Sequence, residues 1–123
     1  INLSETNVTN KGVKELAGVH TIYLRKCYFV GDEGIIPLKG VHTIDATSTN
    51  ITDVGVKVLA EGGVRNIGLE SCKVTNNSAI ALAGVHTVRF YGCRSLNDTG
   101  VKALSGVHTI SIQRCTEVTN EGI

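Results

Sequence analysis

The sequence predicts an α/β solenoid, in which short repeats stack side by side and combine their strands in one parallel sheet. Three observations predict it: a recurring dipeptide, alternating apolar residues after each recurrence, and a short segment that returns the chain. Gly-Val begins a unit at Gly18, Gly40, Gly63, Gly84 and Gly106, so the units are 22, 23, 21 and 22 residues long. Self-similarity at such a period is typical of repeat architectures.

Every unit carries apolar residues at the same offsets. One complete unit reads Val85-x-x-Val88-x-Phe90-x-x-Cys93-x-x-Leu96, followed by Gly100-Val101-x-x-Leu104. This spacing matches the leucine-rich repeat signature, with Val and Ile in place of many leucines. We therefore expect a right-handed leucine-rich-repeat solenoid, with a parallel β-sheet on its concave face and short helices or 3-10 turns on its convex face.

Each unit is expected to form one strand and one helical return. The alternation at residues 21–25 predicts a strand with Ile22 and Leu24 on one face. Residues 52–59, Thr-Asp-Val-Gly-Val-Lys-Val-Leu, predict one or two helical turns with polar caps, and Pro37 favours a 3-10 return in its own unit. No unit can bury its own apolar face, so neighbours must stack. The residues expected side by side in the sheet are Ile22, Ile44, Ile67, Val88 and Ile110.

The repeats extend over the whole sequence. We interpret residues 1–123 as a single array of about five and a half units, starting near residues 1, 18, 40, 63, 84 and 106. Solenoid ends usually carry a polar capping unit, and no such unit is visible in the sequence. We therefore expect the array to be part of a longer one, with neighbouring repeats or chains at its ends.

Composition and charge exclude several classes of partner. The chain is 41% hydrophobic and 19% charged, which is a globular composition. Its formal net charge is +1, with no basic stripe of the kind that neutralises a phosphate backbone, so we expect no nucleic-acid partner. No apolar stretch approaches roughly 18 residues, so we expect no membrane span.

A ladder of small side chains recurs at one repeat position. Cys and Thr share small size and a hydrogen-bond donor, which suits a buried side chain that satisfies loop carbonyls. Stacked side chains point in parallel, so we expect free thiols rather than a Cys72–Cys93 disulfide, and free thiols favour a cytoplasmic setting. The members of this Cys/Thr ladder are Thr6, Cys27, Thr49, Cys72, Cys93 and Cys115.

A second ladder consists of His20, His42, His86 and His108, and Arg65 interrupts it. Three interpretations are open: a scaffold in which each imidazole bonds a neighbouring loop, a contact with a partner, and a weak metal site. A positional ladder in a repeat protein is usually scaffold. We therefore expect no metal and no cofactor.

The sequence contains no pattern typical of catalysis. A P-loop and a Gly-x-Ser-x-Gly elbow are missing, and Asp32-Glu33 is read more simply as negative charge at a helix N-terminus. The chain is therefore expected not to be an enzyme. The glycosylation sequons at Asn7, Asn50, Asn76 and Asn97 arise from the repeated loop composition, which leaves open whether they are used.

The outward residues of the strands are expected to line the concave surface. They vary between units while the core positions repeat, as expected where a fixed scaffold carries a surface free to differ. Tyr and Arg are enriched in binding hot spots. The alternatives are a solvated surface without a partner, and lateral packing through Ile36 and Ile80 on the convex side. The predicted partner-binding residues are Tyr23, Arg25, Lys26, Asp45, Thr47, Glu70, Arg89, Tyr91, Gln113 and Arg114.

The repeats resemble the cysteine-containing leucine-rich repeats of F-box proteins. The most similar stretches are Cys-Lys-Val-Thr-Asn at 72–76 and Asn-Ile-Thr-Asp-Val-Gly-Val-Lys-Val-Leu-Ala at 50–60. The units are a few residues shorter than is usual for that class, and Gly-Val-His-Thr replaces its lead-in. The resemblance implies a module that binds a protein partner, as the substrate receptor of a ubiquitin ligase does.

Overall fold

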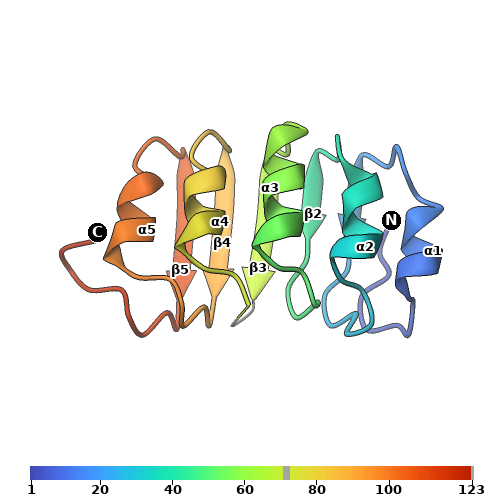
Figure 1. Ribbon diagram of the computed structural model, residues 1–123, viewed down its shortest axis with the longest axis horizontal. Coiled ribbons are helices and arrows are strands. Elements are labelled where there is room, and N and C mark those ends of the chain that lie inside the picture. The colour runs from blue at the N-terminus through green and yellow to red at the C-terminus, as the bar shows by residue number, and fades with distance from the viewer. Residues whose placement is uncertain (71–72, 123) are drawn as a thin grey trace.

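The computed structural model describes residues 1–70 and 73–122, and in these ranges five strands lie parallel in one open sheet. The strands follow one another in sequence order, so a helical segment connects each strand to the next (Figure 1). The elements are α1 (Asn10–Lys14), β1 (Thr21–Tyr23), α2 (Asp32–Ile35), η1 (Ile36–Leu38), β2 (Thr43–Asp45), α3 (Asp53–Glu61), β3 (Asn66–Glu70), α4 (Asn76–Ala81), β4 (Thr87–Tyr91), α5 (Asp98–Ala103) and β5 (Thr109–Gln113).

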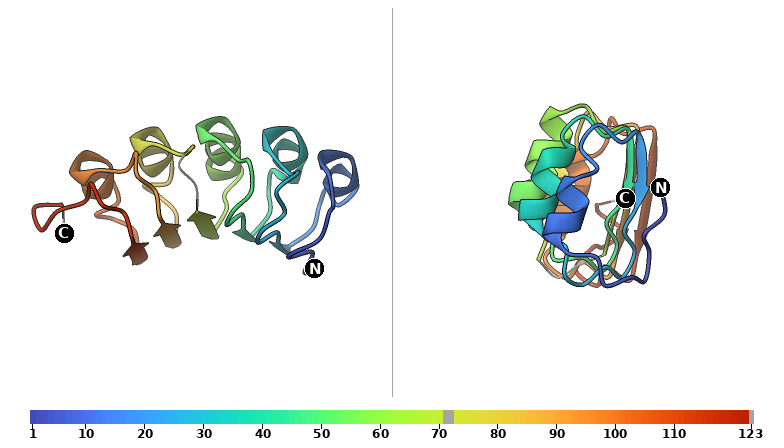
Figure 2. Two further views of the ribbon diagram at one scale, coloured as in Figure 1. Left: turned by 90° about the horizontal axis from the view of Figure 1, so that it is seen from below. Right: turned by 90° about the vertical axis from the view of Figure 1, so that its right-hand side faces the viewer.

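The array is curved, and the sheet lies on its inner side. Figure 2 shows the strands on the inside of the arc and the helices on the outside. Helices pack about 8–10 Å apart, whereas paired strands are about 4.8 Å apart, so the helical side of each repeat needs more room. The predicted α/β class, with a parallel sheet alternating with short helices, is confirmed.

The predicted strand register is also confirmed. Ile22 pairs with Ile44, Ile44 with Ile67, Ile67 with Val88, and Val88 with Ile110. The first four side chains are at most 1% exposed, and each such burial is worth about 1.5–3 kcal/mol. Ile110 is 38% exposed, because in the described part of the chain β5 pairs only with β4.

The helical returns close the core from the outer side. Buried Val, Ile and Leu residues from strands and helices form one continuous cluster along the array. The 3-10 return predicted from Pro37 is confirmed, since α2 ends at Ile35 and continues as η1. Among the described residues, no helix combines the length and apolar character needed to cross a membrane.

A chain of hydrogen bonds joins the start of each helix to the next repeat. The first residue of each helix carries a carboxylate or amide whose oxygen accepts a backbone N–H of the next repeat, at 2.7–3.0 Å. We call this series the helix-start ladder. Its contacts run from Asn10 to Gly31, Asp32 to Thr52, Asp53 to Thr75, Asn76 to Asn97, and Asp98 to Thr119.

Of the two polar residues at the start of α3, α4 and α5, only the first caps its own helix. Thr52, Thr75 and Asn97 cap their own helices by accepting a backbone N–H. The aspartate or asparagine that follows reaches the neighbouring repeat instead. Each aspartate of the ladder also accepts the hydroxyl of the threonine that it holds.

The same oxygens explain the glycine near the start of most helices. A Cβ atom on Gly34 in α2 would lie 2.6 Å from Asn10 Oδ1, and one on Gly100 in α5 would collide with Asn76 Oδ1. Glycine is required here because the neighbouring repeat approaches closely. In the unit of α4 the position holds Ser78, and its hydroxyl donates to Asp53 Oδ1.

Hydrogen bonding also lowers the pKa of two carboxylates of the helix-start ladder, Asp53 and Asp98. Desolvation raises the pKa of Asp53, but hydrogen bonds from Ser78 and Thr75 outweigh it and hold the pKa below its usual 3.8. Hydrogen bonds from Thr119 likewise lower the pKa of Asp98. The stability that these carboxylates contribute is complete above the ordinary pKa and is lost as the pH falls through the lower folded-state pKa.

We expect Gly55→Ala to destabilise the chain, although alanine is the better helix former by up to about 1 kcal/mol. The new Cβ would contact Asp32 Oδ1 and separate this carboxylate from Thr52. Losing hydrogen bonds to a charged group costs about 1–3 kcal/mol, which exceeds the gain in helix propensity. Denaturant unfolding measures the difference.

The matched control is the same substitution in an Asp32→Ala background. There the collision with the carboxylate is gone, so Gly55→Ala should cost clearly less. An equal loss in both backgrounds would show that the contact with Asp32 is not the reason for the glycine.

Candidate functional site

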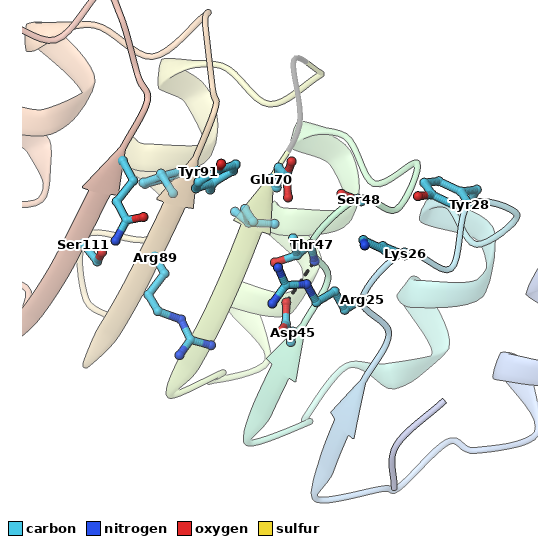
Figure 3. A pocket seen from close by; sticks show the side chains of 13 residues that line it. Arg25, Lys26, Tyr28, Asp45, Thr47, Ser48, Glu70, Arg89, Tyr91 and Ser111 are labelled. Carbon is cyan, nitrogen blue, oxygen red and sulfur yellow. Dashed lines mark hydrogen bonds between the residues drawn. The ribbon is translucent and has the colours of Figure 1, made fainter. Parts of the chain in front are cut away.

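The inner surface of the sheet contains a hollow, which lies over strands β2 to β5. The hollow has a volume of about 580 Å³ and an open mouth (Figure 3). Its floor comes from β2, β3, β4 and β5, and its rim from the turns that follow β1 and β2. It is lined by Arg25, Lys26, Tyr28, Asp45, Thr47, Ser48, Leu69, Glu70, Arg89, Phe90, Tyr91, Ser111 and Gln113.

Eight of the ten residues predicted to bind a partner line this hollow. Tyr23 is 40% exposed but does not line it. The other exception is Arg114, whose guanidinium carbon lies 5.6 Å from the centre of the Tyr91 ring. Arg114 therefore packs against a lining residue as a cation–π partner rather than lining the hollow itself.

Five lining residues are not among the ten predicted ones, and Tyr28 is the most prominent of them. Tyr28 follows the ladder residue Cys27 and is 60% exposed. Figure 3 shows Tyr91, Glu70, Ser48 and Tyr28 in succession along one side of the hollow, with a tyrosine at each end. Strand alternation could not identify Tyr28 because it lies in a turn beyond the strand. The other four are Ser48 in the turn after β2, Ser111 on β5, and the buried residues Leu69 and Phe90.

The rim residues Lys26 and Ser48 have left-handed backbone conformations, with φ of 62° and 56°. The same conformation recurs directly before the Cys/Thr ladder in other units, at Glu5, Gly92 and Arg114. It turns the chain from the sheet toward the helical side. A non-glycine residue in this conformation costs about 1 kcal/mol or more, so the turn is maintained by the packing around it.

Gly68 on β3 pairs with Asp45 of β2 on one side and with Arg89 of β4 on the other. A Cβ atom there would lie 3.2 Å from Asp45 Oδ1 and 3.3 Å from Arg89 Nη2, so both charged groups approach the bare backbone of β3. Asp45 is further fixed by Thr47, whose backbone N–H donates to Oδ1 at 3.0 Å. Glycine at this position leaves room for a charged side chain from each of the two strands that flank β3.

The hollow carries charges of both signs. Arg25, Lys26 and Arg89 contribute positive charge, and Asp45 and Glu70 contribute negative charge. In residues 1–70 and 73–122 the one ion pair within 4.0 Å joins Lys14 to Glu33, outside the hollow. Within the described chain, the charged groups of the hollow are thus available to a partner.

The Cys/Thr ladder lies behind the rim. Thr6 and Thr49 donate to the carbonyls of Leu3 and Ala46 at 2.7 and 2.8 Å. Cys27 donates to Leu3 O at 3.0 Å, and so links two repeats. Cys93 and Cys115 contact carbonyl oxygens at longer range, 3.6 and 3.5 Å. Cys27 and Cys115 are buried free thiols, Cys93 is buried, and Cys72 lies outside the described residues.

The histidines form two stacked pairs rather than one continuous ladder. The rings of His20 and His42, and those of His86 and His108, lie 4.4 Å apart and 15° from parallel. Each Nδ1 bonds the hydroxyl of the next threonine in its own strand, at 2.7–2.9 Å, and not a neighbouring loop as one interpretation expected. Near-parallel rings direct their outer nitrogens side by side, which does not suit a tetrahedral metal.

Asp32 and Glu33 have separate contacts. Asp32 belongs to the helix-start ladder, whereas Glu33 accepts a hydrogen bond from Lys14 at 2.8 Å. This hydrogen bond and the charge of Lys14 lower the pKa of Glu33. In the described residues no group of three or more His, Cys, Asp or Glu side chains is placed to hold a metal.

Three of the sequon asparagines take part in contacts between repeats. The amide of Asn50 donates to Tyr28 O, and its oxygen accepts Lys73 Nζ at 2.9 Å. The amide of Asn76 donates to Asn97 Oδ1 at 2.8 Å. Attachment of a glycan to Asn50 or Asn76 would require the nitrogen that makes these bonds.

No model of a known protein family matches the chain, and no curated protein matches it.

Proposed function

We propose that the chain is a protein-binding module whose partner occupies the hollow on the inner face of the sheet. The observation that carries the proposal is the contrast between the two sides of each strand. Apolar residues repeat on the buried side, whereas the side chains that line the hollow differ from strand to strand in charge, size and hydrogen bonding. A repeated scaffold with a varied open surface supports recognition of one partner among many.

The hollow also has the composition of a binding hot spot. It combines two tyrosines with two arginines, and both residue types are enriched at positions that dominate binding energy. Acidic Asp45 and Glu70 lie between basic groups, which favours a partner that presents both signs of charge.

We further propose that the array is a right-handed leucine-rich-repeat solenoid. The repeat spacing supports the repeat type, and parallel strands joined by crossovers are right-handed in about 98% of cases. A substrate-receptor role in ubiquitination rests on the resemblance to F-box proteins alone and stays a prediction.

The proposal predicts that Arg25→Ala combined with Tyr91→Ala weakens partner binding by about ten-fold or more, because each side chain is a potential hot spot. A photo-reactive residue at Thr47, in the hollow, should capture the partner in cell extract. The same residue at Lys57, on the exposed side of α3, is the position control. Partner identity and affinity follow from mass spectrometry of the adduct and titration of the purified pair.

Lys57→Ala is the matched substitution control and should leave binding unchanged. The proposal would be contradicted if the partner were captured from position 57 in preference to 47. It would also be contradicted if capture from position 47 persisted without the side chains of Arg25 and Tyr91.

An alternative function, lateral packing of arrays, is favoured by one observation. Ile36 and Ile80 on the helical side are 40% and 55% exposed. Ile36→Lys with Ile80→Lys distinguishes the two functions. If arrays pack laterally, this pair of substitutions dissolves an assembly detected by sedimentation, and if the hollow is the binding site it leaves partner capture intact.

The buried free thiols Cys27 and Cys115 support a reducing, cytoplasmic setting, because disulfides persist mainly in oxidising compartments. We expect every cysteine of the unreduced protein to react with an alkylating reagent after denaturation. Peptides joined through Cys72 and Cys93 in the unreduced digest would contradict this expectation.

A further inference from the structure

The edge of the sheet where the strands begin carries a row of five basic side chains, His20, His42, Arg65, His86 and His108. They occupy equivalent positions because each immediately precedes its strand and the strands pair in register. Backbone hydrogen bonds along the row fix it further, with Arg65 N–H donating to His42 O at 2.8 Å and Thr87 N–H donating to Arg65 O at 3.0 Å. Neighbouring groups therefore recur at about the strand spacing of 4.8 Å.

A groove of about 530 Å³ runs beside this row, outside the hollow on the inner face. Cβ atoms built on Gly63 and Gly84 meet nothing within 4 Å, so the backbone in this groove is uncovered. The groove is lined by His42, Gly63, Val64, Arg65, Gly84, Val85, His86, Gly106 and His108.

The imidazole of His42 presents a hydrogen-bond donor whether or not it is protonated. The amide of Asn66 donates to Thr43 Oγ1 at 3.0 Å, which leaves the hydroxyl proton for His42 Nδ1, 2.8 Å away. A neutral ring that accepts at Nδ1 carries its proton on Nε2. A protonated ring donates from both nitrogens, so Nε2 remains a donor.

The groove has positive charge without a matching carboxylate. Its titratable and charged lining groups are His42, Arg65, His86 and His108. The adjoining turns add Lys39, whose Cγ lies close to Gly62, and Glu61, which is exposed and is not a lining residue.

The ionisation of His86 reflects this surplus of positive charge. Desolvation lowers the pKa of His86, and the nearby charges of Arg65 and His108 lower it further. An anion between these groups would remove the repulsion and favour protonation of the imidazole.

We propose that this groove binds a phosphate group, with Arg65 at the centre and His42 and His86 on either side. A guanidinium offers paired donors that match the spacing of phosphate oxygens, and the two imidazoles supply further donors toward the same groove. The site is separate from the proposed protein-binding hollow and does not depend on it.

The test uses the whole chain and NMR titration, with His side-chain and Arg65 amide signals as reporters. Pyrophosphate should shift the signals of His42, His86 and Arg65, and Arg65→Ala should weaken binding by about ten-fold, as expected for loss of a charge-assisted hydrogen bond. Arg94→Ala, which removes an exposed arginine outside the groove, is the matched control and should leave binding unchanged. A phosphoserine peptide of otherwise uncharged sequence tests whether a phosphate carried by a protein binds more tightly than the free anion.

Sulfate stays a dianion over the pH range of interest. Any change of its affinity with pH therefore comes from the protein. We expect sulfate to bind about ten-fold more tightly near pH 5.5 than near pH 8. His42→Gln with His86→Gln keeps polar side chains and should weaken this pH dependence, with His108 left in the groove. Shifts confined to other surfaces, equal binding by Arg65→Ala, or binding of sulfate that is independent of pH would overturn the proposal.

Discussion

Each repeat of this chain completes its core and its hydrogen bonds only through the repeat beside it. Ile67 is buried between the paired residues Ile44 and Val88, and the carboxylate of Asp53 holds the start of the following helical segment at Thr75. These two contacts lie on opposite sides of the array, one in the sheet and one at the helices. Together they fix the spacing and the curvature of the stack, because the sheet sets the inner distance and the helix-start ladder holds the wider outer side together.

The same constraint explains where a binding surface can form. Side chains that face the core and the neighbouring repeats must stay nearly constant, so variation is confined to surfaces that no neighbour covers. The inner face of the sheet and the edge where the strands begin are two such surfaces. On the first, Asp45 and Arg89 approach the bare backbone of Gly68 from the two flanking strands, and on the second, Arg65 interrupts a row of histidines. Both candidate sites are thus departures from the repeat carried on a regular scaffold.

Periodic spacing predicted the sheet, its register and most of the hollow, because alternation along a strand decides which side chains share a face. The 3-10 return at Pro37 could be predicted from the missing amide proton. The helix-start ladder could not, since Asp53 is equally well explained as a local cap when only the sequence is known. Nor could the left-handed turns at Lys26 and Ser48, because these residue types give no signal for a positive φ. Tyr28 was missed for a different reason: the alternation of the strand ends before it, so no pattern assigns its side chain to a face.

The dependence of each repeat on its neighbours is tested most directly by native-state hydrogen exchange in Ile67→Ala. Removing this buried side chain should cost about 2–5 kcal/mol. If the repeats are stable only as a stack, the amides of β2 and β4 lose protection by the same free energy as those of β3, because one unfolding event exposes them all. Loss of protection confined to β3, with β2 and β4 unchanged, would contradict the account.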